Sequence, residues 1–237
     1  MNDVVLKASN ITKTYRSGKL EVNALKDVSF EIKRGEFVAI LGPSGCGKST
    51  LMNILGCLDK QTSGEYLFEG TDTSRLGEDE LAEIRGKKIG FVFQAFNLLP
   101  RINIMRNIEL PLIYNGIDLE ERIKRIHDVL KEVGLLDRLY HTRVELSGGQ
   151  QQKVAIARAL AMHPDMVLAD EPTGNLDTKS SDDVMDLFKR LNEKGVTVIL
   201  ITHESDVAKQ TKRTITLRDG KLVADVDMTI FKEAPQA

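Results

Sequence analysis

One ten-residue stretch decides the fold: Leu41-Gly42-Pro43-Ser44-Gly45-Cys46-Gly47-Lys48-Ser49-Thr50. It fits the pattern G-x-x-x-x-G-K-S/T, in which small residues let backbone N–H groups approach phosphate oxygens. The apolar residues 37–41 before it predict a buried strand, and residues 50–55 after it predict the first turns of a helix. Because a helix N-terminus adds partial positive charge, the sequence predicts a phosphate-binding loop between a strand and a helix.

Two side chains of this loop have predictable roles. We expect Lys48 to reach the β- and γ-phosphates of a nucleotide and Ser49 to bind Mg²⁺. All residues of the loop are expected to contribute to nucleotide binding: Gly42, Pro43, Ser44, Gly45, Cys46, Gly47, Lys48, Ser49 and Thr50.

The composition limits the class of protein. The chain has 237 residues, of which 41% are hydrophobic, which suits one large domain with a sizeable core. Its net charge of −2 does not indicate a nucleic-acid surface. No apolar run approaches the roughly 20 residues of a membrane span, and the N-terminus lacks the pattern of a signal peptide. Its two cysteines, Cys46 and Cys57, are typical of a reducing compartment, so we expect a soluble cytosolic protein.

The order of strands and helices indicates an α/β fold with an insertion. Residues 95–163 contain three predicted helices and no strand, whereas residues 1–94 and 164–237 contain strands and helices. We therefore expect a single domain, in which a sheet-containing core carries a helical subdomain. The predicted strands are residues 4–15, 25–32, 37–41, 65–68, 89–93, 166–169, 196–201, 213–217 and 221–226. The predicted helices after the phosphate loop are residues 76–85, 103–113, 119–133, 150–162 and 178–194.

The helix expected at residues 119–133 has the clearest periodicity. An apolar stripe with helical spacing is expected to face the interior, and it consists of Leu119, Ile123, Ile126, Leu130 and Val133. Residues 234–237, at the other end of the chain, are expected to be a frayed tail.

A second predicted anion site lies far along the chain from Lys48. Ser147 is a natural N-cap, and Gly148 and Gly149 leave the first N–H groups of the following helix accessible. One fold can hardly close both sites on the same phosphate. Two copies arranged head to tail would let residues 147–150 of each copy, Gln150 included, contact the nucleotide of the other.

Two adjacent carboxylates follow the predicted strand at residues 166–169. We expect Asp170 to bind Mg²⁺ and Glu171 to face the γ-phosphate, where it polarises an attacking water molecule.

Three single residues allow two interpretations each when taken alone. Tyr15 at a strand end stacks on a purine base or packs at the surface. Gln94 reaches a metal or water beside the nucleotide, or it is a solvated turn residue. His203 hydrogen-bonds a γ-phosphate oxygen, or it has a structural role.

Taken together and in order, these motifs resemble the nucleotide-binding subunit of ATP-binding cassette (ABC) transporters over residues 5–226. The resemblance favours the functional interpretation of all three single residues. It implies a P-loop NTPase (RecA-like) core with an N-terminal antiparallel β-subdomain and an inserted α-helical subdomain. The matching motifs are the aromatic A-loop (Tyr15), Walker A (Gly42 to Ser49), the Q-loop (Gln94), the signature (Leu146 to Gln150), Walker B (Asp170 and Glu171), the D-loop (Asp177) and the switch histidine (His203).

The resemblance also implies a mechanism. Two cassettes close around two ATP molecules, and Ser49, Gln94 and Asp170 bind Mg²⁺. Glu171 is the general base, and His203 senses the γ-phosphate. Closure moves integral membrane permease subunits, which places the cassette in the cytoplasm on the inner face of the cell membrane, and no nucleic acid is implied.

Two segments, residues 93–100 and 169–177, are similar to the macrolide-exporter and lipoprotein-release branch of the family (MacB/LolD type). The alternatives are an amino-acid or peptide importer cassette and a soluble ABC ATPase without a transport role. Lys153 and Val144 depart from residues that are common around the signature, and residues 101–106 are more basic than is typical. A GTPase-type switch is disfavoured because the guanine-selecting Asn-Lys-x-Asp pattern is absent from the sequence.

Overall fold

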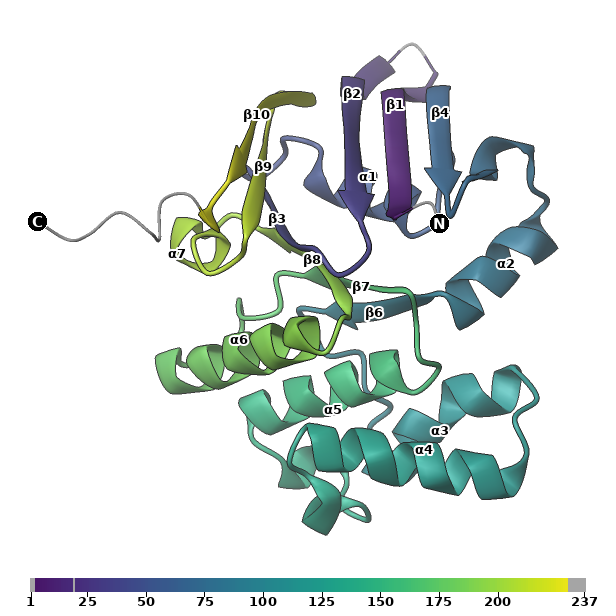
Figure 1. Cartoon of the computed structure of the whole chain (residues 1–237), viewed down its shortest axis with the longest axis vertical. Helices are drawn as coiled ribbons and strands as arrows, with labels where there is room; N and C mark the ends of the chain where they lie inside the picture. Colours follow the sequence, from purple (N-terminus) through teal and green to yellow (C-terminus); the bar gives the residue numbers. More distant parts are fainter. Residues whose placement is uncertain (1–2, 19, 230–237) are drawn as a thin grey trace, which may run out of the picture.

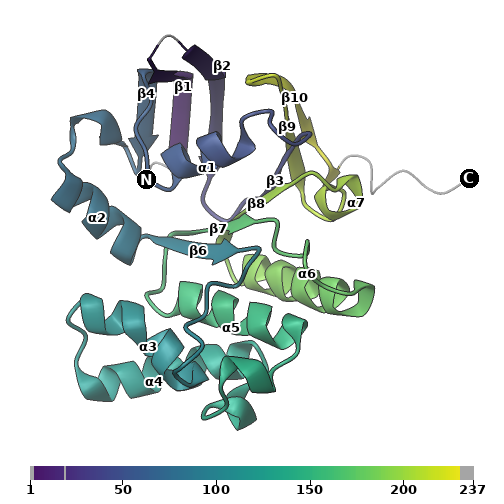
Figure 2. The ribbon, with the colours of Figure 1, turned by 180° about the vertical axis from the view of Figure 1, so that it is seen from behind.

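Two β-sheets and a group of helices form the computed structural model, which describes residues 3–18 and 20–229. In Figure 1 the smaller sheet lies at the top, the larger sheet crosses the middle, and α3, α4 and α5 lie at the bottom. Figure 2 shows the same layers from behind. The tail expected at residues 234–237 lies outside the described residues.

The larger sheet has the strand order β10-β9-β3-β8-β7-β6, and the strands from β9 to β6 run parallel. Both faces are covered, which explains why β3, β7 and β8 are almost uninterrupted apolar runs. Its strands are β3 (Phe37–Leu41), β6 (Ile89–Phe93), β7 (Met166–Asp170), β8 (Thr197–Thr202), β9 (Arg213–Arg218) and β10 (Lys221–Asp227).

The smaller sheet is antiparallel and has the order β2-β1-β4-β5. Both β1 and β2 are longer than predicted, because their polar ends continue to pair as a two-stranded ribbon, with Tyr15 opposite Val22 and Ser17 opposite Leu20. Its strands are β1 (Val4–Ser17), β2 (Leu20–Lys33), β4 (Ser63–Phe68) and β5 (Thr71–Asp72).

The α-helices lie close to the predicted ranges, except that α7 is too short to show a periodicity. They are α1 (Lys48–Leu55), α2 (Glu78–Lys87), α3 (Ile104–Tyr114), α4 (Leu119–Glu132), α5 (Gly148–Leu160), α6 (Thr178–Glu193) and α7 (Ser205–Ala208). Short 3₁₀ turns form η1 (Thr73–Arg75), η2 (Leu136–Arg138) and η3 (Arg143–Glu145). No helix in residues 3–18 and 20–229 has both the length and the apolar character that a membrane crossing requires.

Alternate residues of the central strands belong to two separate cores. In β8, Val198 and Leu200 face the core that is shared with α3, α4, α5 and α6. Ile199 and Ile201 face the opposite core, which contains α1 and the smaller sheet. The helix that follows the phosphate loop is thereby packed between the two sheets.

The apolar stripe expected along α4 is buried only over its second half. Ile126, Leu130 and Val133 are buried as predicted, whereas Leu119 and Ile123 are 58% and 42% exposed. Periodicity identifies the inward face of a helix, but it cannot show how far the neighbouring helices extend along that face.

Candidate functional site

The predicted phosphate loop connects β3 to α1 and is shaped by two glycines. Gly47 has a φ of 106°, a conformation that other residues rarely adopt. A Cβ atom at Gly47 would lie 2.5 Å from the carbonyl oxygen of Ala24, and one at Gly42 would lie 2.4 Å from that of Leu217. Close contact with β2 and β9 therefore requires glycine at both positions.

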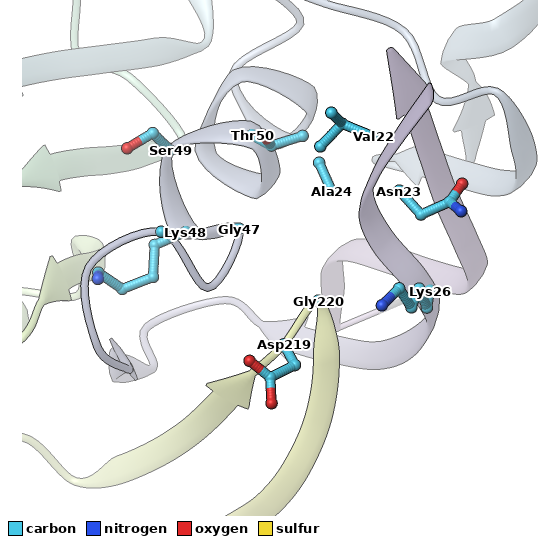
Figure 3. A pocket seen from close by; sticks show the side chains of 11 residues that line it. Val22, Asn23, Ala24, Lys26, Gly47, Lys48, Ser49, Thr50, Asp219 and Gly220 are labelled. Carbon is cyan, nitrogen blue, oxygen red and sulfur yellow. The ribbon is translucent and has the colours of Figure 1, made fainter. Parts of the chain in front are cut away.

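Lys48 is turned back onto its own loop. Its side chain is nearly buried, and its ammonium donates hydrogen bonds to the carbonyl oxygens of Gly42 at 2.7 Å and Pro43 at 2.9 Å. In Figure 3 the side chain points away from the side of the pocket formed by Val22 and Asn23. An incoming phosphate would compete with these carbonyl oxygens for the ammonium.

A pocket of about 340 Å³ lies beside the loop, between β2, α1 and the turn that joins β9 to β10 (Figure 3). Asp219 and Gly220 are typical of a hairpin turn between two strands, and no local pattern singles out Lys26. The pocket is lined by Val22, Asn23, Ala24, Lys26, Gly45, Gly47, Lys48, Ser49, Thr50, Asp219 and Gly220.

The parallel register brings the ends of four strands to one edge of the larger sheet. Asp170 at the end of β7 is paired with Phe93 of β6 and with Ile201 of β8. Thr202 of β8 is paired with Leu41 of β3, directly before the phosphate loop. The three predicted catalytic residues each follow one of these strand ends: Gln94, Glu171 and His203.

The predicted carboxylate pair lies at this edge with the histidine. Oε1 of Glu171 is 2.7 Å from Nδ1 of His203, and Glu171 has a φ of 44°. Burial raises the pKa of the Asp170 carboxyl, the neighbouring Glu171 raises it further, and Lys48 partly offsets both effects. The electrostatic coupling to Lys48 places Asp170 beside the phosphate loop.

Gln94 contacts the loop that follows β7. A Cβ atom at Gly174 would lie 2.6 Å from Nε2 of Gln94, so a side chain there would displace the end of Gln94. Nδ2 of Asn175 donates a 3.0 Å hydrogen bond to the carbonyl oxygen of Gln94. These contacts join the end of β6 to the segment after the carboxylate pair, and sequence reasoning did not single out Gly174 or Asn175 for this role.

The second predicted anion site is a capped helix N-terminus. Oγ of Ser147 accepts from the backbone N of Gln150, and Oε1 of Gln150 accepts from the backbone N of Ser147, which is a reciprocal capping box. Asp177 caps α6 through the backbone N of Ser180 at 3.0 Å. A Cβ atom at Gly149 would lie 2.8 Å from Cβ of Ser180, so the two helix starts pack closely.

Within the described chain, this helix N-terminus is not part of the pocket beside the phosphate loop. None of the residues that line that pocket comes from positions 147–150, and Ser147 is exposed. The two predicted anion sites therefore lie apart from each other in a single chain.

Tyr15 lies near the exposed end of β1 and is 42% exposed. Its hydroxyl donates a 2.9 Å hydrogen bond to Oδ2 of Asp59, which is 44 residues away in the sequence. Sequence reasoning missed Asp59, because nothing in a local pattern indicates a contact over that separation.

A second cavity, of about 250 Å³, lies between α2, β6 and the helices α3 and α5. Arg158 borders it, and its guanidinium donates to the carbonyl oxygens of Phe96 and Asn97, two residues with positive φ just after Gln94. The lining residues are Arg85, Gly86, Ile89, Gly90, Phe91, Phe93, Pro111, Arg158, Ala159 and Met162.

Comparison with known proteins agrees with this geometry. A family model described as ABC transporter matches residues 25–174. The ABC transporter ATP-binding protein YvrO of Bacillus subtilis (strain 168) is 53% identical over 221 residues, which are 93% of this chain and 96% of that protein. The macrolide export ATP-binding/permease protein MacB of Hyphomonas neptunium is 47% identical over the whole chain, which spans only 37% of that protein.

A solved structure is similar over nearly the same range. The ATP-binding cassette MJ0796, in a dimeric post-hydrolysis state bound to ADP and Pi, aligns with a TM-score of 0.85 and 49% sequence identity. The alignment covers 94% of this chain and 98% of that one.

Proposed function

The chain belongs to the ABC transporter family as an ATP-hydrolysing cassette, and from this premise we propose that it works as a homodimer that drives a separate membrane permease. The permease is of the MacB/LolD type, and its cargo is a lipoprotein, a macrolide or a peptide. The relatedness to MacB supports this choice, since that protein's name combines an ATP-binding part with a permease. Binding to such a permease holds the cassette on the cytoplasmic face of the membrane.

The phosphate loop binds ATP through its backbone N–H groups and the positive end of α1. Lys48 exchanges the carbonyl oxygens of Gly42 and Pro43 for phosphate oxygens. Ser49, Asp170 and Gln94 would hold Mg²⁺, which would supply positive charge beside the phosphates. This ion commonly takes only one or two carboxylates with water and phosphate as its other ligands, so this small donor set fits it.

Glu171 accepts a proton from the water molecule that attacks the γ-phosphorus, and the bond to the leaving ADP oxygen breaks. The contact between Glu171 and His203 orients the carboxylate and places the imidazole at the same strand ends. We assign His203 to the recognition of the γ-phosphate, and Asp177 to the contact between the two cassettes.

The proposal that the chain works as a dimer rests on one observation. Ser147 is the exposed N-cap of α5, and residues 147–150 do not line the pocket of their own phosphate loop. A second copy in head-to-tail orientation brings Ser147, Gly148, Gly149 and Gln150 to the γ-phosphate and completes the site. The dimeric arrangement of MJ0796 supports this proposal.

The permease binds in the cavity between α2, β6, α3 and α5. Its walls are largely apolar, and they include Phe91, Phe93 and Met162. Among the described residues, neither Arg85 nor Arg158 forms an ion pair with a carboxylate, so both charges are available to an acidic group on the partner. A short permease segment with apolar residues and a carboxylate fits this cavity.

Size-exclusion chromatography of Glu171→Gln tests the proposal. Without its base the variant binds ATP but cannot hydrolyse it, so we expect a stable dimer with ATP and Mg²⁺ and a monomer without nucleotide. Adding Ser147→Arg to this variant is the matched control, because it blocks the contact in trans and should leave a monomer that still binds ATP. A Glu171→Gln protein that stays monomeric at saturating ATP would contradict the proposal.

A further inference from the structure

Two charged neighbours surround the aromatic ring of Tyr15. Its hydroxyl donates a 2.9 Å hydrogen bond to Oδ2 of Asp59. The ammonium of Lys13 lies over the ring, 4.9 Å from its centroid, within the range of a cation–π interaction. Lys13 also donates a 2.6 Å hydrogen bond to Oδ1 of Asp59, so these three side chains form a closed set that we call the Tyr15 triad.

Asp59 is itself held in place. Its backbone N donates to the carbonyl oxygen of Asn53, and its Oδ1 accepts a 2.7 Å hydrogen bond from the backbone N of Lys60. Lys13 donates a second hydrogen bond to the carbonyl oxygen of Lys60. Burial raises the pKa of Asp59, but the hydrogen bonds from Lys13, Tyr15 and Lys60 outweigh burial and lower it, so the carboxylate stays charged.

The triad joins β1 to the loop after α1, and Tyr15 also lies near the start of that helix. Asp59 lies in the loop that leaves α1, whereas Thr50 lies in its first turn. Burial and the bond to Asp59 raise the pKa of Tyr15, and a hydrogen bond with Thr50 partly offsets them. Val22, opposite Tyr15 in the sheet, lines the pocket beside the phosphate loop together with Thr50.

Tyr15 is 42% exposed, so part of its ring remains accessible to a ligand. The ammonium of Lys13 covers one face of the ring, and the bond to Asp59 fixes the direction of the hydroxyl. A ring that is already fixed loses less conformational freedom when a flat base stacks on it. Disrupting the triad should therefore weaken the binding of ligands that carry a base and leave the binding of the phosphates unchanged.

We propose that Asp59 and Lys13 are positioning residues, which hold Tyr15 as a preformed platform for the base of ATP. This inference rests on the proposed function, because it needs ATP to bind at the neighbouring phosphate loop. The simpler alternative is that the triad only ties β1 to the loop after α1. That alternative predicts an equal effect on every ligand of the phosphate loop.

Calorimetric titration with two ligands separates the alternatives. ATP carries a base, whereas inorganic tripolyphosphate presents three phosphates without one. We expect Asp59→Asn to weaken ATP binding by about threefold to tenfold, or roughly 0.7–1.4 kcal/mol at 1.4 kcal/mol per tenfold, with tripolyphosphate affinity unchanged within about twofold. Tyr15→Phe, which removes only the hydroxyl, should give the same pattern.

Glu21→Gln is the matched control. Glu21 forms an exposed ion pair with Arg16 on the same pair of strands, so this variant makes the same change of charge outside the triad. It should bind both ligands like the unmodified chain. In a Tyr15→Ala background, where the platform is gone, Asp59→Asn should cause no further loss of ATP affinity.

Three results would overturn the inference: equal weakening of both ligands by Asp59→Asn, no weakening of ATP binding, or a further loss in the Tyr15→Ala background. If Asp59→Asn does not fold, the first two criteria apply to Tyr15→Phe. Unchanged ATP affinity of Tyr15→Ala would also overturn the inference, because the ring would then not contact the base. The proposed function fails separately, if the unmodified chain binds no ATP.

Discussion

Nδ1 of His203 lies 2.7 Å from Oε1 of Glu171, across the ends of the adjacent parallel strands β7 and β8. Glu171 holds this position with a φ of 44°, and its backbone N donates to the carbonyl oxygen of Ile201. The carboxylate is therefore oriented from two sides, by the backbone of β8 and by the imidazole. A change at His203 should disturb the direction of Glu171, the proposed base, as well as the proposed contact with the γ-phosphate.

Replacing His203 with alanine should reduce ATP hydrolysis by about 100-fold, because a correctly positioned proton-transfer group contributes about 10²–10⁴-fold. ATP binding should weaken by less than about threefold, since the loss of one contact with the γ-phosphate leaves the contacts of the phosphate loop in place. Steady-state ATPase rates and the dissociation constant of ATP measure the two effects separately. Hydrolysis at the unmodified rate would show that the contact with Glu171 is only structural.

Replacing Asp170 with asparagine should stabilise the nucleotide-free protein. The folded-state pKa of Asp170 is raised, first by burial and then by Glu171, so the folded chain holds this proton more tightly than the unfolded chain. Stability is then highest below the unfolded pKa and falls as the pH rises through the folded pKa. We expect the midpoint of thermal unfolding at pH 7 to rise by about 1–3 °C, a small change for a partly exposed carboxyl.

The pH dependence checks this explanation for Asp170. The difference in unfolding midpoint between Asp170→Asn and the unmodified chain should widen from pH 4 to pH 7. A difference that is constant, or that shrinks with rising pH, would contradict the raised pKa. The same variant should lose Mg²⁺-dependent ATP hydrolysis. The carboxylate of Asp170 would then be required for activity although its charge destabilises the nucleotide-free protein.

The central sheet could be predicted because its strands are apolar runs buried on both faces, as in residues 37–41 and 166–169. The glycine and carboxylate motifs at the strand ends were equally local signals. Contacts between distant segments had no such signal, as the hydrogen bonds from Tyr15 to Asp59 and from Arg158 to Phe96 illustrate. They depend on strand register and on how the helical part packs, which periodicity does not specify.

Gln152 connects the signature helix to the carboxylate pair. Its side chain is fully buried in α5, and its Nε2 donates a 2.8 Å hydrogen bond to the carbonyl oxygen of Pro172, the residue after Glu171. Gln152→Met, which keeps the volume, leaves this buried oxygen unpaired at a cost of about 1–3 kcal/mol. We expect kcat to fall by about fivefold with KM nearly unchanged, since the base is displaced and the phosphate loop is not.

Lys153→Met is the control for Gln152, because Lys153 lies on the same helix in an ion pair with the exposed Asp183. This variant should change unfolding by less than about 1 kcal/mol and leave kcat as it is. If Gln152→Met lowers stability without changing kcat, the hydrogen bond to Pro172 holds the fold together and does not position Glu171.

Charge reversal in the cavity between α2 and α5 should detach the cassette from its permease. Arg85 lines this cavity, and its guanidinium donates to the carbonyl oxygen of Cys57. Arg85→Glu would oppose an acidic group of the partner, and like charges brought together cost several kcal/mol, so the amount recovered with washed membranes should fall by about tenfold or more. Lys87→Glu, on the same helix but in an exposed ion pair with Glu83, should remain membrane-bound.

A photo-reactive residue in place of Met162 should cross-link to an integral membrane protein. If both charge variants are recovered equally and no such cross-link forms, the permease contact lies elsewhere.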